Sequence, residues 1–187
     1  LCCGTIWESK GQPEVADRKL RELEDALWKA SEEGKYPVLC DQSPCLHRMR
    51  GHIRKMHLYE PAEFIWTFLR ERLEFHPVEE TVAVHPTCST RLMGLTDTLV
   101  GLARLCAAKV VVPEGVGCCG FAGDKGMTHP ELNAYALRKL RGELAEAGAT
   151  EGFSNSRTCE IGLSDHGGIP YRSIVYLVNR CTTAREA

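Results

Sequence analysis

The sequence predicts an α/β fold of two related units, each with alternating strands and helices and a mainly parallel sheet, arranged as a pseudo-twofold internal duplication. The first observation behind it is a repeated motif: Cys-Cys-Gly occurs at residues 2–4 and again at 118–120, and a further single cysteine follows each copy, Cys45 or Cys159. The second is the order of the elements, because strands that alternate with helices are typical of parallel sheets with right-handed crossovers.

Three strands and three helices are expected in the second half. The strands are expected at Thr81–Val84, at Lys109–Pro113 and near Thr150–Ser154. Between and after them, apolar residues recur at the spacing of one helix face, and Pro170 is expected to open the last helix. The helix-face residues are Leu95, Leu99, Leu102 and Cys106, then Leu132, Ala136, Leu140 and Leu144, and last Ile174, Leu177, Val178 and Cys181.

The first half has the same order with its opening removed. A helical face follows the first Cys-Cys-Gly, then a strand at Tyr36–Leu39, then a closing helix that starts at Pro61. The residues of that first face are Ala16, Leu20, Leu23, Leu27 and Ala30. We therefore expect an N-terminally truncated first unit at 1–75 and a second unit at 76–187.

Composition narrows the class of protein. The chain has 187 residues, 43% hydrophobic and 26% charged, with a formal net charge of −2, as in soluble globular proteins. Charges of both signs are interspersed along the chain, so the composition does not indicate nucleic acid as a partner, and no apolar run is long enough for a transmembrane helix. The chain has ten cysteines, but it is not small and its expected helices are rich in Leu and Ala, which favours a reducing compartment over a secreted disulfide framework. A cytoplasmic location is expected, including peripheral association with the inner face of a membrane.

Four cysteines should meet at one edge of the second sheet. Cys88, Cys118, Cys119 and Cys159 each follow a predicted strand, and functional groups in parallel sheets gather beyond the carboxyl ends of the strands. Four thiolates are the usual ligand set of zinc or of an iron–sulfur cluster. Two adjacent ligands require a loop, since neighbouring side chains of a strand point to opposite faces.

Other cysteines have simpler interpretations. Vicinal cysteines also occur as buried residues, as a strained disulfide or as a thiol–disulfide redox pair. Cys106 and Cys181 lie on apolar helix faces and are expected to be core residues. Cys40 is expected to be structural.

The charged residues near these sites leave two alternatives open. His85 is either a loop cap or, less favoured, a metal ligand. The stretch His47–His57 contains Arg48, Arg50, Arg54 and Lys55 and is expected to be a solvated basic face. A docking patch for a domain or for an acidic electron partner is the alternative.

These motifs resemble the cysteine-rich CCG domain. The matching stretches are residues 1–5, 41–45, 85–90, 117–124 and 154–162, which together extend over essentially the whole chain. The domain occurs twice in heterodisulfide reductase and in the iron–sulfur subunit of glycolate oxidase. It also forms the C-terminal part of FAD-dependent D-lactate dehydrogenase-type oxidoreductases, which the chain resembles most.

The resemblance implies a division of labour in a longer polypeptide or complex. A flavin domain with FAD would oxidise a 2-hydroxy acid such as D-lactate or glycolate. Iron–sulfur modules, among them ferredoxin-like domains with 4Fe–4S clusters, would pass electrons to a quinone or cytochrome. This chain has no Gly-rich dinucleotide loop, so neither catalytic residues nor a flavin site are assigned to it, and it is expected to be inactive alone.

The chain departs from the fullest family pattern at two positions. That pattern ends in Cys-x-x-Cys, whereas this sequence has Ser156 before Cys159 and Gln42 before Cys45. The resemblance therefore implies a four-thiolate set at Cys88, Cys118, Cys119 and Cys159, and an incomplete set at Cys2, Cys3 and Cys45. The alternative function is a structural zinc-binding or docking domain without a redox role.

Overall fold

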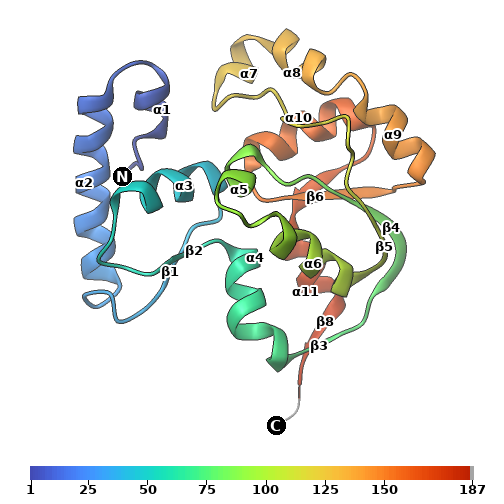
Figure 1. Cartoon of the computed structure of the whole chain (residues 1–187), viewed down its shortest axis with the longest axis horizontal. Coiled ribbons are helices and arrows are strands. Elements are labelled where there is room, and N and C mark those ends of the chain that lie inside the picture. The colour runs from blue at the N-terminus through green and yellow to red at the C-terminus, as the bar shows by residue number, and fades with distance from the viewer. Residues whose placement is uncertain (186–187) are drawn as a thin grey trace. The chain divides into compact units, whose positions relative to one another are not determined.

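The computed structural model describes residues 1–185 and confirms an α/β protein with parallel strands (Figure 1). The chain divides into two compact units, Leu1–Pro61 and the residues from Ala62 onward. The sequence pattern predicted the boundary between residues 75 and 76. The two boundaries differ because the helix that begins at Pro61 was expected to belong to the first unit.

The first unit is mainly helical. The long helix α2 begins with Pro13 in its first turn, where a missing N–H costs nothing, and it buries Ala16 and Leu20. A two-stranded parallel sheet pairs Val38 with Leu58. The elements are α1 (Thr5–Ser9), α2 (Pro13–Ala30), β1 (Val38–Leu39), α3 (Ser43–His52) and β2 (Leu58–Tyr59).

The second unit holds the larger sheet. Its helical elements are α4 (Pro61–Phe64), the π-helix η1 (Ile65–Leu69), η2 (Arg70–Arg72), α5 (Cys88–Leu92), α6 (Thr96–Cys106), α7 (Lys125–Thr128), α8 (Pro130–Ala136), α9 (Leu140–Ala147), α10 (Arg157–Gly167) and α11 (Ile174–Cys181). Its strands are β3 (Leu73–Phe75), β4 (Val78–Val84), β5 (Ala107–Val111), β6 (Glu151–Ser154), β7 (Tyr171–Ser173) and β8 (Thr182–Ala184).

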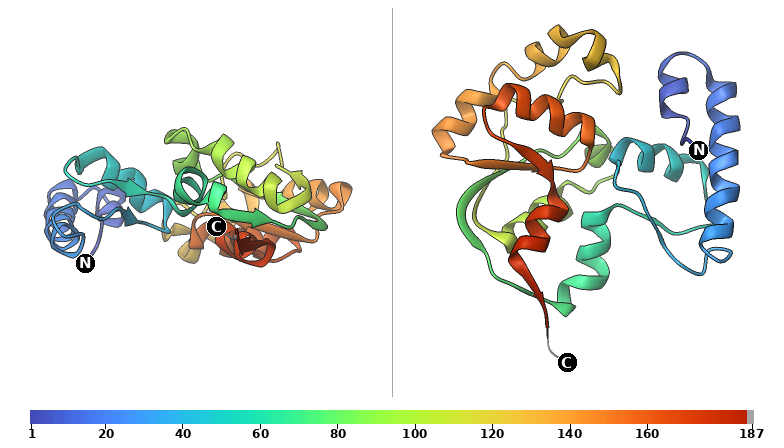
Figure 2. Two further views of the ribbon diagram at one scale, coloured as in Figure 1. Left: turned by 90° about the horizontal axis from the view of Figure 1, so that it is seen from below. Right: turned by 180° about the vertical axis from the view of Figure 1, so that it is seen from behind.

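Four parallel strands form the main sheet in the order β5-β4-β6-β7. Strands β4 and β6 run side by side at its centre (Figure 1; Figure 2, right). The chain leaves β4 toward β5 on one side and leaves β6 toward β7 on the other. The carboxyl ends of β4 and β6 therefore flank a topological switch point, where open parallel sheets bind their ligands.

Successive side chains of β4 point to opposite faces of this sheet, and each face packs against its own hydrophobic core. Val82 and Val84 pack with α6 and α11 residues such as Leu99 and Leu177. Ala83, between them, belongs to the opposite core, which includes Leu140 of α9. Among the described residues, no helix has both the length and the apolarity needed to cross a bilayer.

Two expected helices differ in the structure. The helix expected to run from Leu132 to Leu144 is broken into α8 and α9 by a turn around Leu137. Pro170 does not open a helix: it precedes β7, and the last helix begins at Ile174. The sheet thus gains a fourth strand that the sequence pattern did not indicate, because three residues are too few to show alternation.

The helix that begins at Pro61 was expected to close the first unit. Ala62 and Ile65 instead belong to the core cluster of the second unit, together with Leu99. An apolar helix face has no preference for the preceding or the following unit, so sequence alone does not assign it. The internal duplication itself stays a prediction, and the structure is compatible with it.

Candidate metal centre

The four cysteines of the second unit come from three loops at the switch point. Cys88 is the first residue of α5, directly after β4. Cys118 and Cys119 lie in the loop that follows β5, and Cys159 lies in the first turn of α10, after β6. The structure places each of these loops beyond the carboxyl end of its strand, as the sequence predicts.

These four side chains form a continuous chain of contacts. The Cys119 thiol donates a hydrogen bond to the Cys159 sulfur at 2.8 Å. Cys118 interacts with the side chains of both Cys119 and Cys88. The structure thus brings together Cys88, Cys118, Cys119 and Cys159, and their role as metal ligands stays a prediction.

The thiols differ in exposure and in acidity. Cys88 and Cys118 are exposed, whereas Cys119 and Cys159 are buried. Hydrogen bonds from Cys119 and Cys88 hold the pKa of Cys118 far below that of a free thiol. The same contacts raise the pKa of Cys119 and of Cys88. These hydrogen bonds therefore favour the thiolate form at Cys118 over the thiolate form at its two neighbours.

The donor types suit a thiophilic metal, although the sulfurs do not surround one point. Among residues 1–185, no group of three or more His, Cys, Asp or Glu side chains is arranged around a common ion position. Tetrahedral zinc with Zn–S bonds of about 2.3 Å separates its sulfurs by about 3.8 Å. The 2.8 Å contact between Cys119 and Cys159 is shorter, so these thiols would move apart to share a metal or a cluster. The four cysteines therefore fit a metal or an iron–sulfur cluster in the type of donor that they offer, and the structure describes them as free thiols.

Polar side chains beneath the site fix the loops. Thr87 caps α5 by accepting a hydrogen bond from the Thr90 N–H at 3.2 Å. The Asn155 amide after β6 donates to the Thr90 hydroxyl at 2.6 Å, which ties the loop after β4 to the loop after β6. Arg91 donates to the Gly117 carbonyl at 2.6 Å and so holds the loop that carries Cys118. None of these support residues was expected from the sequence.

The glycine of the Cys-Cys-Gly motif makes a tight turn. Gly120 has φ +73°, a left-handed value that glycine adopts without a steric cost. Its N–H donates to the Cys118 sulfur at 3.3 Å. A Cβ atom at this position would lie 2.6 Å from the Leu132 carbonyl oxygen, so the turn packs directly against α8.

The first unit repeats this local arrangement around Cys2, Cys3 and Cys45. The Gly4 N–H donates to the Cys2 sulfur at 3.4 Å, and Gly4 is also left-handed, with φ +89°. The side chains of Cys3 and Cys45 are hydrogen-bonded to each other, which lowers the pKa of Cys3 to about 5 and raises that of Cys45. Cys45 is the third residue of α3, as Cys159 is of α10.

A different group supports the buried cysteine in each unit. In the second unit, the Asn133 amide donates to the Cys119 carbonyl. In the first unit, the Arg48 Nε donates to the Cys3 carbonyl at 2.9 Å, and its Nη2 donates to Asp17 at 2.7 Å. Each unit therefore fixes the backbone of its second cysteine with one buried side chain.

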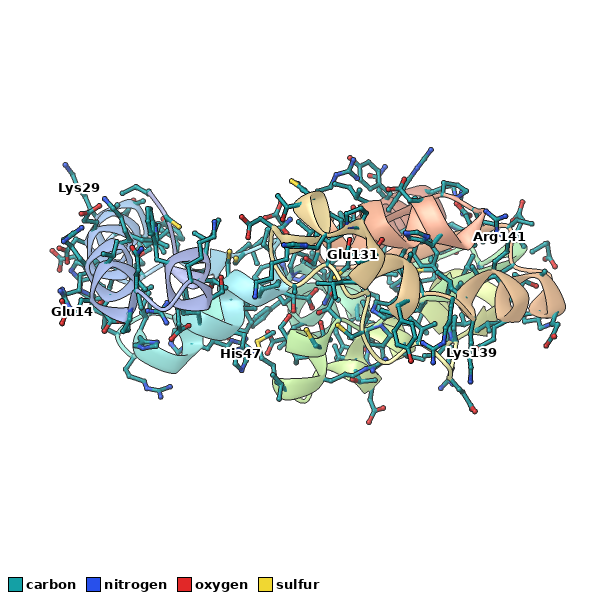
Figure 3. The ribbon with its side chains drawn as sticks, turned by 90° about the horizontal axis from the view of Figure 1, so that it is seen from above. Glu14, Lys29, His47, Glu131, Lys139 and Arg141 are labelled. Atoms are coloured by element: carbon teal, nitrogen blue, oxygen red, sulfur yellow. The ribbon has the colours of Figure 1, made fainter. Side chains whose placement is uncertain are left out.

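Arg48 corrects the expectation of a solvated basic face. Its side chain is only 3% exposed and is paired with Glu8 and Asp17. The neighbouring His47 lies at the surface of α3, as expected for that face (Figure 3). Helical spacing contained the signal, because Arg48 lies three residues after Cys45 and on the same side of α3.

The other three cysteines, Cys106, Cys181 and Cys40, belong to neither of the two thiol sets. Cys106 and Cys181 are buried in the core of the second unit, where their side chains interact. Cys40 follows β1, and its thiol donates to the Gln42 carbonyl at 3.5 Å. All ten cysteines are free thiols in the structure.

Comparison with known proteins yields one similar curated protein and no matching family model. The chain is 26% identical to the glycolate oxidase iron-sulfur subunit of Escherichia coli (strain K12) over 198 aligned residues. The alignment covers 96% of this chain and 48% of that subunit. The chain thus spans about half the length of the relative that it matches.

Proposed function

We propose that the chain is an iron–sulfur electron-transfer module of an oxidoreductase of the glycolate oxidase type. The observation that carries the proposal is the chain of contacts that joins Cys88, Cys118, Cys119 and Cys159 at the switch point of the sheet. The likeness to a glycolate oxidase iron-sulfur subunit supports it independently.

The four thiols would hold the cluster as thiolates, and the bound cluster would supply one-electron redox chemistry. Cys119 and Cys159 would hold it on the side that faces the protein, where burial keeps water away. Cys88 and Cys118 are exposed and would mark the side from which an electron partner approaches. The module would therefore accept and donate electrons at the edge of the sheet.

The finer parts of the proposal concern the whole oxidoreductase. We propose an FAD domain outside this chain that oxidises D-lactate or glycolate, further ferredoxin-like domains, and a quinone or cytochrome acceptor. We also propose that Cys2, Cys3 and Cys45 form a second, smaller thiol set. The enzyme would be cytoplasmic and peripheral at the inner face of the membrane.

A structural zinc site is the second candidate, because four thiolates also suit zinc. Anaerobic purification of the chain, followed by metal and sulfide analysis and a visible spectrum, separates the two candidates. Iron with acid-labile sulfide and absorption near 400 nm, bleached on reduction, supports the electron-transfer module. Colourless protein with zinc supports the structural site.

Two alanine variants test the ligand assignment. Cys119→Ala removes a thiol of the contact chain, and we expect it to abolish most of the bound iron. Cys106→Ala removes a buried core thiol and is the matched control, with iron content unchanged. Equal iron in both variants would exclude Cys119 as a ligand.

A further inference from the structure

His85 has a buried nitrogen for which the structure supplies no partner. It follows the last residue of β4, and its side chain is 1% exposed. Within the described part of the chain, its Nε2 atom makes no hydrogen bond. Leaving such a group unpaired is unfavourable, and few buried polar atoms in folded proteins are left in this state. The position therefore indicates a hydrogen-bond partner that is absent from the bare chain.

Two hydrogen bonds to β6 hold the backbone of His85 in place. The His85 N–H donates to the Phe153 carbonyl at 2.9 Å, and the Ser154 hydroxyl donates to the His85 carbonyl at 2.8 Å. Both partners belong to β6, on the other side of the switch point. The backbone of His85 is therefore fixed to β6 at the switch point.

Two ionisable side chains act on the imidazole, those of Arg91 and Cys118. Burial and, to a smaller extent, the Arg91 guanidinium lower the pKa of His85 to about 4, and Cys118 opposes both. An imidazole carries at least one N–H in either protonation state, so the buried ring can donate a hydrogen bond. Arg91 has only donors and already donates to the Gly117 carbonyl, so of these two groups only the Cys118 sulfur can accept a hydrogen bond from the ring.

We propose that the Nε2–H of His85 donates a hydrogen bond to sulfur at Cys118 when the site holds its cluster, and so raises the cluster's reduction potential. A hydrogen bond to a cluster sulfur stabilises the added electron, and this is one means by which proteins set the potential. His85 is thus a positioning and tuning residue outside the four-thiolate ligand set. The inference rests on the proposed function.

Three variants of the whole chain, purified anaerobically, test it. His85→Phe removes the N–H and keeps a planar ring in the buried space. His85→Gln returns an N–H donor. His76→Phe is the matched control, because His76 is exposed and precedes the opposite end of β4. Iron content is measured first, and the midpoint potential is then measured by redox titration of the visible absorption.

We expect all three variants to keep the iron content of the unaltered chain. The potential should fall in His85→Phe, recover at least in part in His85→Gln, and stay unchanged in His76→Phe. An unchanged potential in His85→Phe would overturn the inference. Loss of iron from both His85 variants would also overturn it, because it would identify His85 as a ligand.

Pulsed electron paramagnetic resonance of the reduced, unaltered chain tests the inference even if the variants do not fold. Labelling with ¹⁵N-histidine should reveal a weak coupling, typical of a hydrogen-bonded nitrogen. A strong coupling, typical of nitrogen bound to iron, or no coupling at all, would contradict the inference. If the unaltered chain binds no iron, the proposed function fails first, and this result is distinguishable from the others.

Discussion

Replacing Gly120 by alanine tests how tightly the Cys-Cys-Gly turn packs. The left-handed backbone, with φ +73°, costs an L-residue about 1–2 kcal/mol. The new Cβ would also lie 2.6 Å from the Leu132 carbonyl oxygen and 2.7 Å from the Ala136 Cβ, so α8 would have to shift. Overpacking of this kind costs about 1–3 kcal/mol. We therefore expect Gly120→Ala to lower the free energy of unfolding by about 2–5 kcal/mol.

The matched control is Gly148→Ala at the end of α9. Gly148 is also left-handed, with φ +68°, but a Cβ there would meet no atom within 4 Å. This variant should therefore lose only the backbone contribution, about 1–2 kcal/mol. Urea unfolding of the metal-free chain, followed by circular dichroism, measures both losses. Equal losses in the two variants would refute the close approach of Gly120 to α8.

Two further predictions concern buried polar side chains. Arg48→Met removes the hydrogen bond to the Cys3 carbonyl and the ion pairs of Arg48, and we expect a loss of about 2–3 kcal/mol in unfolding free energy. Arg54→Met, at an exposed position, should change stability by less than about 0.5 kcal/mol, and equal effects would contradict the role of Arg48. Tyr171→Phe removes a buried hydroxyl that has no partner among the described residues, and should stabilise the chain by about 1 kcal/mol. The exposed Tyr135→Phe should be neutral, and a destabilising Tyr171→Phe would reveal a partner for that hydroxyl.

Much of the second unit could be predicted because its signals are local. The runs around Val82, Val110 and Phe153 are three of the four strands of the parallel sheet, and the helix face of Leu99 is part of the core. The convergence of Cys88, Cys118, Cys119 and Cys159 followed from one topological rule, that loops beyond the carboxyl ends of parallel strands meet.

The remaining features depend on contacts between distant residues. Pro170 marks the start of β7 because Tyr171 pairs with Gly152 of β6, and no local pattern shows that pairing. Arg48 is buried because the Cys3 carbonyl and Asp17 lie beside α3. Such partners become visible only when the chain has folded, so composition alone assigned Arg48 to the surface.

The side chains that support the two Cys-Cys-Gly turns could not be predicted from the sequence either. Gly162 gives room to the Asn133 side chain, which a Cβ at that position would meet. At the corresponding place of the first unit, three residues after the helix cysteine, Arg48 fills the space and pairs with Asp17. The repeated motif thus predicts where the thiols lie, whereas the groups that hold them differ between the units.

X-ray absorption of the anaerobically purified chain, at the iron and zinc edges, tests the central claim most directly. The account predicts iron with a first shell of sulfur and a short iron–iron distance, and loss of this signal in Cys119→Ala. Zinc in a sulfur shell, or iron surrounded by oxygen, would contradict it.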